Sequence, residues 1–506
     1  MPPSPFLPAL LALLPLALML ITMWPVRGAN ETAAWRLFRL LAPAALGVTA
    51  VTLALQLLGV TSPLPPSLAA SLPGAWVALL VQLLGTVIGS FSQRYLQGEP
   101  GQPRYVTALA GVLAAVHLLL LAGHWLVLIA AWAAVGVALQ RLLCFYPDRP
   151  FGLLAAHKKR LADRLADVLL VVAAALAWNA VGSGAFVDLW RHLETAAPSV
   201  ALQASAICLV LAVMLRTALL PVHGWLMQVM EAPTPVSAVL HAGVVNLGGF
   251  VLVLFSPLLE AVPVARWLLV GVGMATAMLA GLVMLTRVSI KVRLAWSTAA
   301  QMGFMVMECG LGLYTLALMH LIGHSLYKAH AFLAASGAVE GTRLRMMRLP
   351  TAPSTASLVL APFAAASIVG LLVMVAPAAT WPAWWSGVLA LAWAPLMWWP
   401  RPSSPDAPST AHRVLAGGGM VAALALAALL GHALPFGVAD APDHAAGLAA
   451  LFGMALLYGC LALLQARPHA LATWRRWSYA GFYIDEIVTR AALRIWPARW
   501  TSPAKP

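Results

Sequence analysis

Apolar runs of about 20 residues recur along the whole chain of 506 residues, and they constrain its fold more than any other feature. The hydrocarbon core of a bilayer, roughly 30 Å thick, requires helices of this length and composition. Only 9% of the residues are charged, whereas soluble domains contain about 25%. A soluble fold of this size would lack the polar surface that it needs. We therefore predict an all-α, polytopic membrane protein with about 15 transmembrane helices.

The positions of the basic residues predict how these helices are oriented. The formal net charge is +14, which in another chain would indicate nucleic-acid binding. Here all but four of the 30 Lys and Arg residues lie in loops after odd-numbered apolar segments or in the C-terminal tail. By the positive-inside rule these parts are cytoplasmic, so the N-terminus is external and the C-terminus cytoplasmic. The charge excess thus indicates topology, and no nucleic-acid partner is predicted.

The order of the apolar segments predicts how the chain is divided. The fourth to eighth and the ninth to thirteenth segments form consecutive groups of five, and an odd number gives the two groups opposite orientations, as in inverted repeats. Interrupted helices are expected at matching places, at Pro221 in the seventh segment and at Pro362 in the twelfth, which is expected to end at Pro377. The predicted divisions are a three-helix segment (1–100), the first repeat (101–260), the second repeat (261–400), two further transmembrane helices (401–466) and a cytoplasmic amphipathic helix with its tail (467–506).

Ionisable side chains inside apolar segments are candidate functional residues, because each costs roughly 2.5–3.5 kcal/mol at the bilayer centre. His320, His324 and Lys328 follow one another at intervals of four residues in the eleventh segment, which places them on one face of a helix. Histidine titrates near neutral pH, so this stripe is a candidate proton relay. The alternative is that the three side chains only form structural hydrogen bonds with neighbouring helices. A row of three such groups favours the relay.

The second group of candidate residues surrounds Pro221. Proline removes a backbone hydrogen bond, and non-helical backbone at membrane depth must be buried in protein or line a cavity. We expect Arg216 and His223 to flank this break. The alternative is a proline kink with structural polar contacts.

A further residue is a candidate for the ion path, together with Arg216 and His223, and three polar residues are candidates for a supporting role. His241, which we place on the ion path, and Asn246 follow in the eighth segment, and Glu231 is expected near the cytoplasmic surface. Asp167 lies at the start of the sixth segment, three residues after Arg164. For Asp167 the favoured interpretation is an interfacial ion pair with Arg164.

The residues from Tyr479 to Trp496 have the pattern of an amphipathic helix. The apolar positions that recur at helical spacing are Ile484, Ile487, Val488, Ala491 and Ile495. The charged residues that line another face are Glu486, Arg490 and Arg494. Such a helix lies on a membrane or docks on a partner. The alternative is a surface helix with no specific partner.

Two long motifs resemble a known family. The stretch LPVHGWLMQVMEAPTPVSAVLHAGVV, followed by IKVRLAWSTAAQMGFMVMECG and MHLIGHSLYKAHAFLAASG, is similar to the signature of the antiporter-like subunits of respiratory complex I, membrane-bound hydrogenases and Mrp-type sodium/proton antiporters. Together with Arg164 and Asp167, the likeness covers about residues 120–340. It implies that the matching residues lie on the family's proton path; they are His241, His320, His324 and Lys328.

The chain also departs from this family pattern. Energy-converting members carry a glutamate in the fifth segment, where residues 132–136 of this chain read WAAVG, with Ala133 in its place. The family's lysine in the seventh segment falls at Arg216, and a guanidinium cannot practically release its proton. The twelfth segment, 354–376, contains no lysine. These departures argue against a complete proton pump.

The stretches HGWLMQVMEAPTPVSAVLHAGVVNLGGF and GFYIDEIVTRAALRIWP are most similar to the membrane subunits of Dab-type inorganic-carbon uptake complexes. This resemblance implies a transport subunit, not an enzyme, in a bacterial inner membrane. It would couple a gradient of protons or Na⁺ to the conversion of CO₂ to bicarbonate by a large cytoplasmic partner with a carbonic-anhydrase-like zinc site. No cofactor is expected in this chain, because its four cysteines are far apart and no residues have zinc-ligand spacing.

Two other functions stay open. One is a proton-pumping subunit of an NADH–quinone oxidoreductase or a Mrp-type antiporter, against which Ala133 and Arg216 argue. The other is a membrane scaffold that moves no ion, which would have no need to bury the stripe of histidines and lysine.

Overall fold

The computed structural model describes residues 6–24, 30–60, 63–335, 352–376, 381–399, 409–467 and 469–497. These parts of the chain consist of helices and loops, with only two isolated β-bridges. Every predicted apolar segment coincides with a helix, except the eighth, which coincides with two successive helices. The prediction of an all-α fold is confirmed.

The helices before the predicted break are α1 (Phe6–Met23), α2 (Glu31–Leu57), α3 (Leu72–Tyr95), α4 (Gln102–Leu120), α5 (Trp125–Leu143), α6 (Pro150–Val181), α7 (Phe186–Thr195) and α8 (Val200–Arg216). The next are α9 (Gly224–Gln228), α10 (Thr234–Ala242), α11 (Leu247–Leu254), α12 (Ser256–Ala261), α13 (Pro263–Met284), α14 (Ile290–Leu311) and α15 (Tyr314–Leu333). The last are α17 (Thr355–Val375), α18 (Ala383–Trp393), α19 (Thr410–His432), α20 (His444–Ala466), α21 (Ala472–Tyr479) and α22 (Ile484–Ile495).

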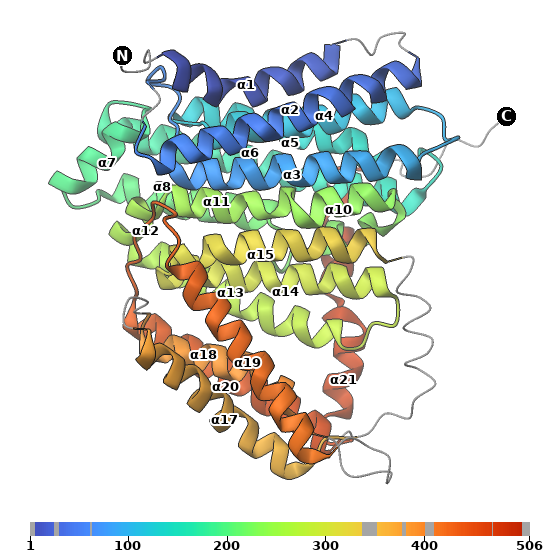
Figure 1. Cartoon of the computed structure of the whole chain (residues 1–506), viewed down its shortest axis with the longest axis vertical. Coiled ribbons are helices and arrows are strands. Elements are labelled where there is room, and N and C mark those ends of the chain that lie inside the picture. The colour runs from blue at the N-terminus through green and yellow to red at the C-terminus, as the bar shows by residue number, and fades with distance from the viewer. Residues whose placement is uncertain are drawn as a thin grey trace.

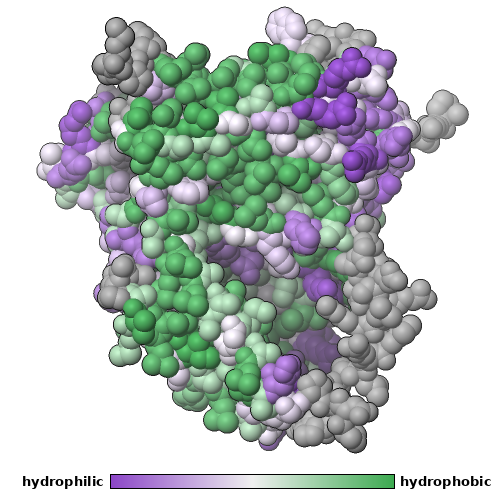
Figure 2. Space-filling view, viewed as in Figure 1, coloured by the Kyte–Doolittle hydropathy of each residue, from purple (hydrophilic) through white to green (hydrophobic). Residues whose placement is uncertain are grey.

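The helices have the length and surface of a membrane protein. Among the described residues, ten helices are long and apolar enough to cross a bilayer, with α10 and α11 counted as one, and three shorter apolar helices accompany them. Figure 2 shows apolar side chains covering the middle of one face over α1–α3 and α11, with hydrophilic side chains gathered toward the ends of these helices. The chain is a multi-span membrane protein, and the number of 15 crossings stays a prediction.

The helices form two groups that lie side by side. In Figure 1, the long helices between α1 and α15 run next to one another across the view, and α17–α20 form a second, tilted group below them. The first group shares one large apolar core. The second group has a smaller core of its own and shares another with α13, α14 and α15. The division at residues 260 and 400 stays a prediction, and the boundary at 400 lies outside the described residues.

The last two helices cross the ends of the others. Figure 1 shows α21 running along one end of the bundle, roughly across the direction of α13 and α14. The chain then contacts α9 and α6 through α22. We call α21 and α22 the tail helices, and the end of the bundle on which they lie the tail end.

Close helix packing positions the polar residues of α14. The backbones of α13 and α14 touch at two glycines, since a Cβ atom on Gly273 would lie 2.6 Å from the carbonyl oxygen of Gly303, and the reverse is also true. Small residues allow membrane helices to approach in this way. The contact holds α14 against the interior of the first group, with Glu308 facing α15.

The prediction that Pro362 interrupts the twelfth segment is wrong. Helix α17 continues through Pro362 from Thr355 to Val375. A proline at this position leaves the carbonyl of Leu358, four residues earlier, without its helical donor. The Tyr458 hydroxyl of α20 donates to that carbonyl at 2.7 Å, so the helix does not need to break. Pro377, the expected end of this segment, lies outside the described residues.

The break at Pro221 is confirmed, and a second break follows it. Helix α8 ends at Arg216, and the next short helix, α9, begins at Gly224. A further interruption separates α10 from α11, where Gly243 leaves helical geometry and a short 3-10 turn follows. A Cβ atom on Gly243 would lie 2.8 Å from the carbonyl oxygen of Val239, so this turn favours glycine.

Candidate functional site

The first polar cluster joins α6 to the end of α8. Arg216 forms an ion pair with Asp167, and the two side chains are 4% and 18% exposed. Arg164 also approaches Asp167, at 3.7 Å, but its side chain is 68% exposed. The predicted pair with Arg164 is therefore present, and the buried partner of Asp167 is Arg216 from another helix. Charges at this depth need such a partner.

Helix α5 completes this cluster with its backbone. Arg216 Nη1 donates to the carbonyl oxygen of Trp132 at 2.8 Å, and the guanidinium lies 4.8 Å from the centre of the indole ring. A pocket of about 260 Å³ opens next to Ala133 and is lined by Asp163 and Asp167. The carboxylates around Arg216 thus come from α6, whereas the residue on α5 has only a methyl group.

The second polar cluster lies along α15 and contains the predicted stripe. His320 Nδ1 donates to Glu308 Oε2 of α14 at 2.7 Å. The rings of His320 and His324 are 6.2 Å apart. Lys328 is fully buried and donates to the carbonyl oxygen of Leu294 at 3.0 Å. The structure therefore places all three stripe residues between α15 and its neighbours, as the spacing predicts.

Helices α10 and α11 close the other side of the stripe. The ring of His241 stacks on Phe332 with centroids 4.6 Å apart and lies within electrostatic range of Lys328. Asn246 Nδ2 donates to the Ser325 hydroxyl at 2.7 Å. The ring nitrogens of His241 form no hydrogen bond with another described residue, and the same is true of His324. Neither imidazole therefore joins two helices through a hydrogen bond.

The end of α15 opposite the tail end is fixed by a loop. Asp440, between α19 and α20, accepts a hydrogen bond of 2.7 Å from the backbone nitrogen of Thr315. Burial raises the pKa of the Asp440 carboxyl, and the hydrogen bonds from α15 oppose that rise. This contact sets the position of the helix that carries the stripe.

The remaining predicted residues lie between α8 and α10, with His223 in the break and Glu231 in the 3-10 turn after α9. His223 is buried, with its ring 4.9 Å from that of Trp296 on α14. Glu231 accepts a hydrogen bond of 3.2 Å from the backbone nitrogen of Gly152 and so ties the break to the start of α6. The structure does not bring Glu231 into either cluster.

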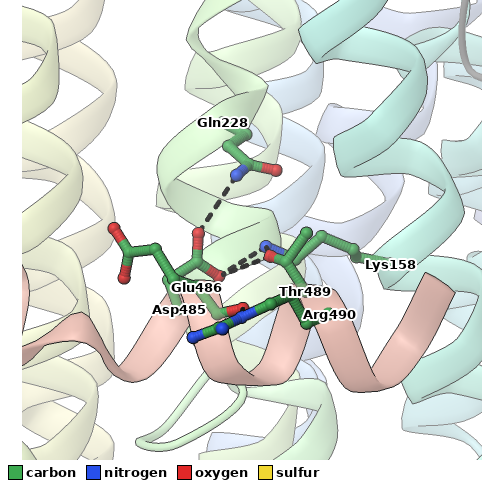
Figure 3. A network of polar contacts seen from close by, with 6 residues as sticks. All are labelled: Lys158, Gln228, Asp485, Glu486, Thr489 and Arg490. Carbon is green, nitrogen blue, oxygen red and sulfur yellow. Dashed lines mark hydrogen bonds and ion pairs between the residues drawn. The ribbon is translucent and has the colours of Figure 1, made fainter. Parts of the chain in front are cut away.

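The C-terminal helix, α22, contacts α9 next to the break, and not only the outer surface of the bundle. It begins at Ile484, after a turn at Gly481–Tyr483, and not at Tyr479 as predicted. Figure 3 shows Asp485 pointing from α22 toward Lys158 of α6 and Gln228 of α9. Asp485 forms an ion pair with Lys158, and Gln228 Nε2 donates to it at 3.0 Å.

Sequence reasoning missed two of these residues, Glu308 and Asp485. Glu308 had a signal of its own, since it is a carboxylate in an apolar segment and is only 3% exposed. Asp485 had none, because its partner Lys158 is 327 positions away in the chain. Among the described residues, no three His, Cys, Asp or Glu side chains gather as ligands for a metal ion.

Comparison with known proteins places the chain in a family. Residues 122–350 match the family described as "NADH:quinone oxidoreductase/Mrp antiporter, TM". The chain is 37% identical over 453 residues to a protein of Hydrogenovibrio crunogenus named "Probable inorganic carbon transporter subunit DabB", and the alignment covers 86% of each chain. It is 46% identical over 273 residues to the "Probable inorganic carbon transporter subunit DabB2" of Halothiobacillus neapolitanus, over 53% of this chain and 49% of that one.

A more distant relative and two solved structures agree with this result. The chain is 34% identical to NADH-ubiquinone oxidoreductase chain 5 of Metridium senile, over 53% of this chain and 44% of that one. The Mrp complex of Dietzia sp. DQ12-45-1b has a TM-score of 0.58 at 22% identity, over 99% of this chain and 53% of that one. An archaeal respiratory complex, the membrane-bound sulfane sulfur reductase, has a TM-score of 0.55 at 16% identity, over 92% and 77%.

These likenesses show a shared fold, and the relatives are named as subunits of larger complexes. The chain belongs to the family of antiporter-like membrane subunits that includes the DabB subunits of inorganic carbon transporters.

Proposed function

We propose that this chain couples a proton gradient to inorganic-carbon uptake, as the membrane subunit of a larger complex. The observation that carries the proposal is the row formed by Glu308, His320, His324 and Lys328, which is buried except for the half-buried His320, in a chain with DabB relatives. Buried ionisable groups in a membrane protein mark ion pathways, because their burial is costly.

The row has the geometry of a proton path. Successive members on α15 are four residues apart, which is about 6 Å along a helix of 1.5 Å rise per residue. Protons cross such a gap directly or through one bridging water. His324, in the middle, forms no hydrogen bond with another described residue, so its ring nitrogens are available for proton transfer. Imidazole suits this step because it changes charge near neutral pH.

The first cluster has a different part in the proposal. Arg216 keeps its charge at all physiological pH values, so it acts as a fixed positive charge at the break and not as a carrier. The ion pair with Asp167 holds that charge in place. This feature, with Ala133 on α5, favours the carbon-uptake function over a proton-pumping oxidoreductase or a Mrp-type antiporter.

A partner is needed for the chemistry. We propose a large carbonic-anhydrase-like zinc protein, bound at the tail end, which faces the cytoplasm of a bacterial inner membrane. The positive-inside rule supports this orientation, because the loops that are rich in Lys and Arg would lie on that side. The zinc chemistry, the hydration of CO₂, would belong to the partner.

The test measures bicarbonate accumulation in cells that express the chain with its partner. We expect accumulation that an uncoupler abolishes, and co-purification of a large zinc protein. If a sodium gradient drives accumulation in the presence of a protonophore, the coupling ion is Na⁺ and not the proton. Co-purification with oxidoreductase subunits, without bicarbonate accumulation, would contradict the proposal.

A further inference from the structure

The tail helices connect parts of the chain that are distant in sequence. Helix α21 contacts α13, and α22 contacts α6 and α9. The Arg287 guanidinium lies 5.9 Å from the ring centre of Tyr479 and 5.4 Å from that of Trp296. The tail helices therefore bridge the tail end, from α13 in the second half of the chain to α6 and α9 in the first half.

The strongest contact of the tail is made by Asp485. Besides its ion pair with Lys158 and its hydrogen bond from Gln228, it lies beside Thr489, whose hydroxyl accepts from Lys158 Nζ at 2.7 Å. The Lys158 side chain is only 4% exposed, so its charge depends on this partner. Figure 3 shows these side chains converging from α6, α9 and α22.

The backbone of α9 is shaped to receive this carboxylate. A Cβ atom on Gly224 would lie 1.4 Å from Asp485 Oδ1 and 2.1 Å from its carboxyl carbon. Any other residue at position 224 would therefore displace Asp485. The absence of a side chain on the first residue of α9 is a condition for the contact.

This contact adjoins the proposed ion path. Gly224 directly follows His223, whose ring packs on Trp296 of α14. Two residues earlier on α14 is Leu294, whose carbonyl oxygen accepts from Lys328. A continuous series of contacts thus runs from Asp485 on the surface helix to Lys328 in the stripe.

We propose that Asp485 is a positioning residue that holds α22 on α9 and thereby sets His223 against α14, next to the stripe. Through this contact, a partner on the tail helices acts on the ion path. The inference rests on the proposed function, because it assigns the link between the path and the partner. Asp485 itself carries no proton along the path.

Two variants test this role by different means. Asp485→Asn removes the charge and keeps the size, and Gly224→Ala displaces the carboxylate and keeps every charge. The measurement is the initial rate of bicarbonate uptake into membrane vesicles that contain the whole complex, at increasing imposed pH gradients. We expect the slope of rate against gradient to fall about tenfold in both variants, since small displacements have large effects on positioned groups. The amount of bound partner and the uptake rate with an uncoupler should not change.

The controls separate positioning from stability. Glu486→Gln alters the neighbouring exposed carboxylate, and Gly281→Ala adds a methyl group where nothing lies within 4 Å; both should keep the wild-type slope. In an Asp485→Ala background, Gly224→Ala should have little further effect, because the carboxylate is then gone and the remaining close atom, Lys158 Nζ at 2.7 Å, is the end of a flexible side chain. Additive losses in this double variant would overturn the inference.

The remaining outcomes are distinct from a failure of the proposed function. If the wild-type complex shows no gradient-dependent uptake, the proposed function fails. If the wild type shows it and both variants keep the full slope, only the role of Asp485 fails. If the variants lose the partner in proportion to uptake, Asp485 anchors the partner and does not position the path.

Discussion

Glu308 and His320 lie on neighbouring helices, α14 and α15, and share a hydrogen bond of 2.7 Å at the end of the stripe opposite Lys328. The Glu308 side chain is 4% exposed and that of His320 is 15% exposed. This pair is where the stripe approaches the end of the bundle away from the tail helices. It therefore has the position of an entry or exit group for the path.

The first prediction concerns this pair. Glu308→Gln keeps a hydrogen-bond acceptor for His320 but cannot bind or release a proton. We expect gradient-driven bicarbonate uptake to fall about tenfold or more, as is typical when a proton-transfer group is lost, at an unchanged protein level. Uptake at the wild-type rate would show that Glu308 only orients His320.

The second prediction concerns the middle of the stripe. His324→Gln removes an imidazole that can accept and release a proton, and Lys328→Met removes the only buried Lys or Arg of α15 in the described part of the chain. Each should abolish uncoupler-sensitive accumulation without a loss of partner binding. His330→Gln is the matched control, because that histidine is exposed on the same helix. If His324→Gln cells accumulate bicarbonate at the wild-type rate, the path does not run along α15.

The third prediction concerns Arg216. In Arg216→Ala the Asp167 carboxylate loses its buried partner, which should destabilise the protein by about 3 kcal/mol and abolish uptake. Arg216→Lys keeps a charge without the geometry of the guanidinium and should retain part of the activity. Thermal unfolding of the purified chain, together with uptake in cells, measures both effects. Arg191→Gln is the control, since it breaks an exposed pair with Asp188 and should change neither. If Arg216→Ala shows wild-type uptake, the break at Pro221 has no part in the mechanism.

The fourth prediction concerns the tail. Truncation after Leu464 removes both tail helices and should leave membrane insertion intact, because all the apolar helices remain. The truncated chain should fail to retain the partner in a pull-down from detergent extracts. Retention of the same partner at the wild-type level would show that the tail helices are not its binding site.

The fifth prediction concerns helix α17. Tyr458→Phe removes the donor to the Leu358 carbonyl and should cost about 1 kcal/mol of unfolding free energy. Pro362→Ala gives that carbonyl a donor of its own within the helix. The cost of Tyr458→Phe should therefore be smaller in the Pro362→Ala background. Equal costs in the two backgrounds, measured by thermal unfolding, would mean that the tyrosine does not satisfy this carbonyl.

The sequence was sufficient to predict the helices and the stripe, for the same physical reason. Both are periodic features of one continuous segment, since a bilayer fixes the helix length and the helical turn places residues four apart on one face. His320, His324 and Lys328 therefore share a face as predicted. The break at Pro221 was predictable because proline acts on its own segment.

Features that join distant segments were not predictable from one sequence. Pro362 has the same local signal as Pro221, yet α17 is continuous, because Tyr458 comes from a helix 100 positions beyond the carbonyl that it satisfies. The sequence predicts a pair between Asp167 and its neighbour Arg164, because no local pattern indicates that α6 and α8 bring Arg216 to Asp167. The contact of Asp485 with α9 is of the same kind.

The distance in sequence between Lys158 and Asp485 has a consequence for biogenesis. Membrane helices are inserted in order during translation, so α6 and its lysine enter the membrane long before residue 485 is synthesised. Until then the ammonium group of Lys158 lacks the carboxylate that compensates its burial, and the break around α9 lacks its cover. Only a chain that has been translated past Asp485 can close this contact. A prematurely terminated chain leaves a buried charge unpaired, and that defect distinguishes it from the finished subunit before any partner is bound.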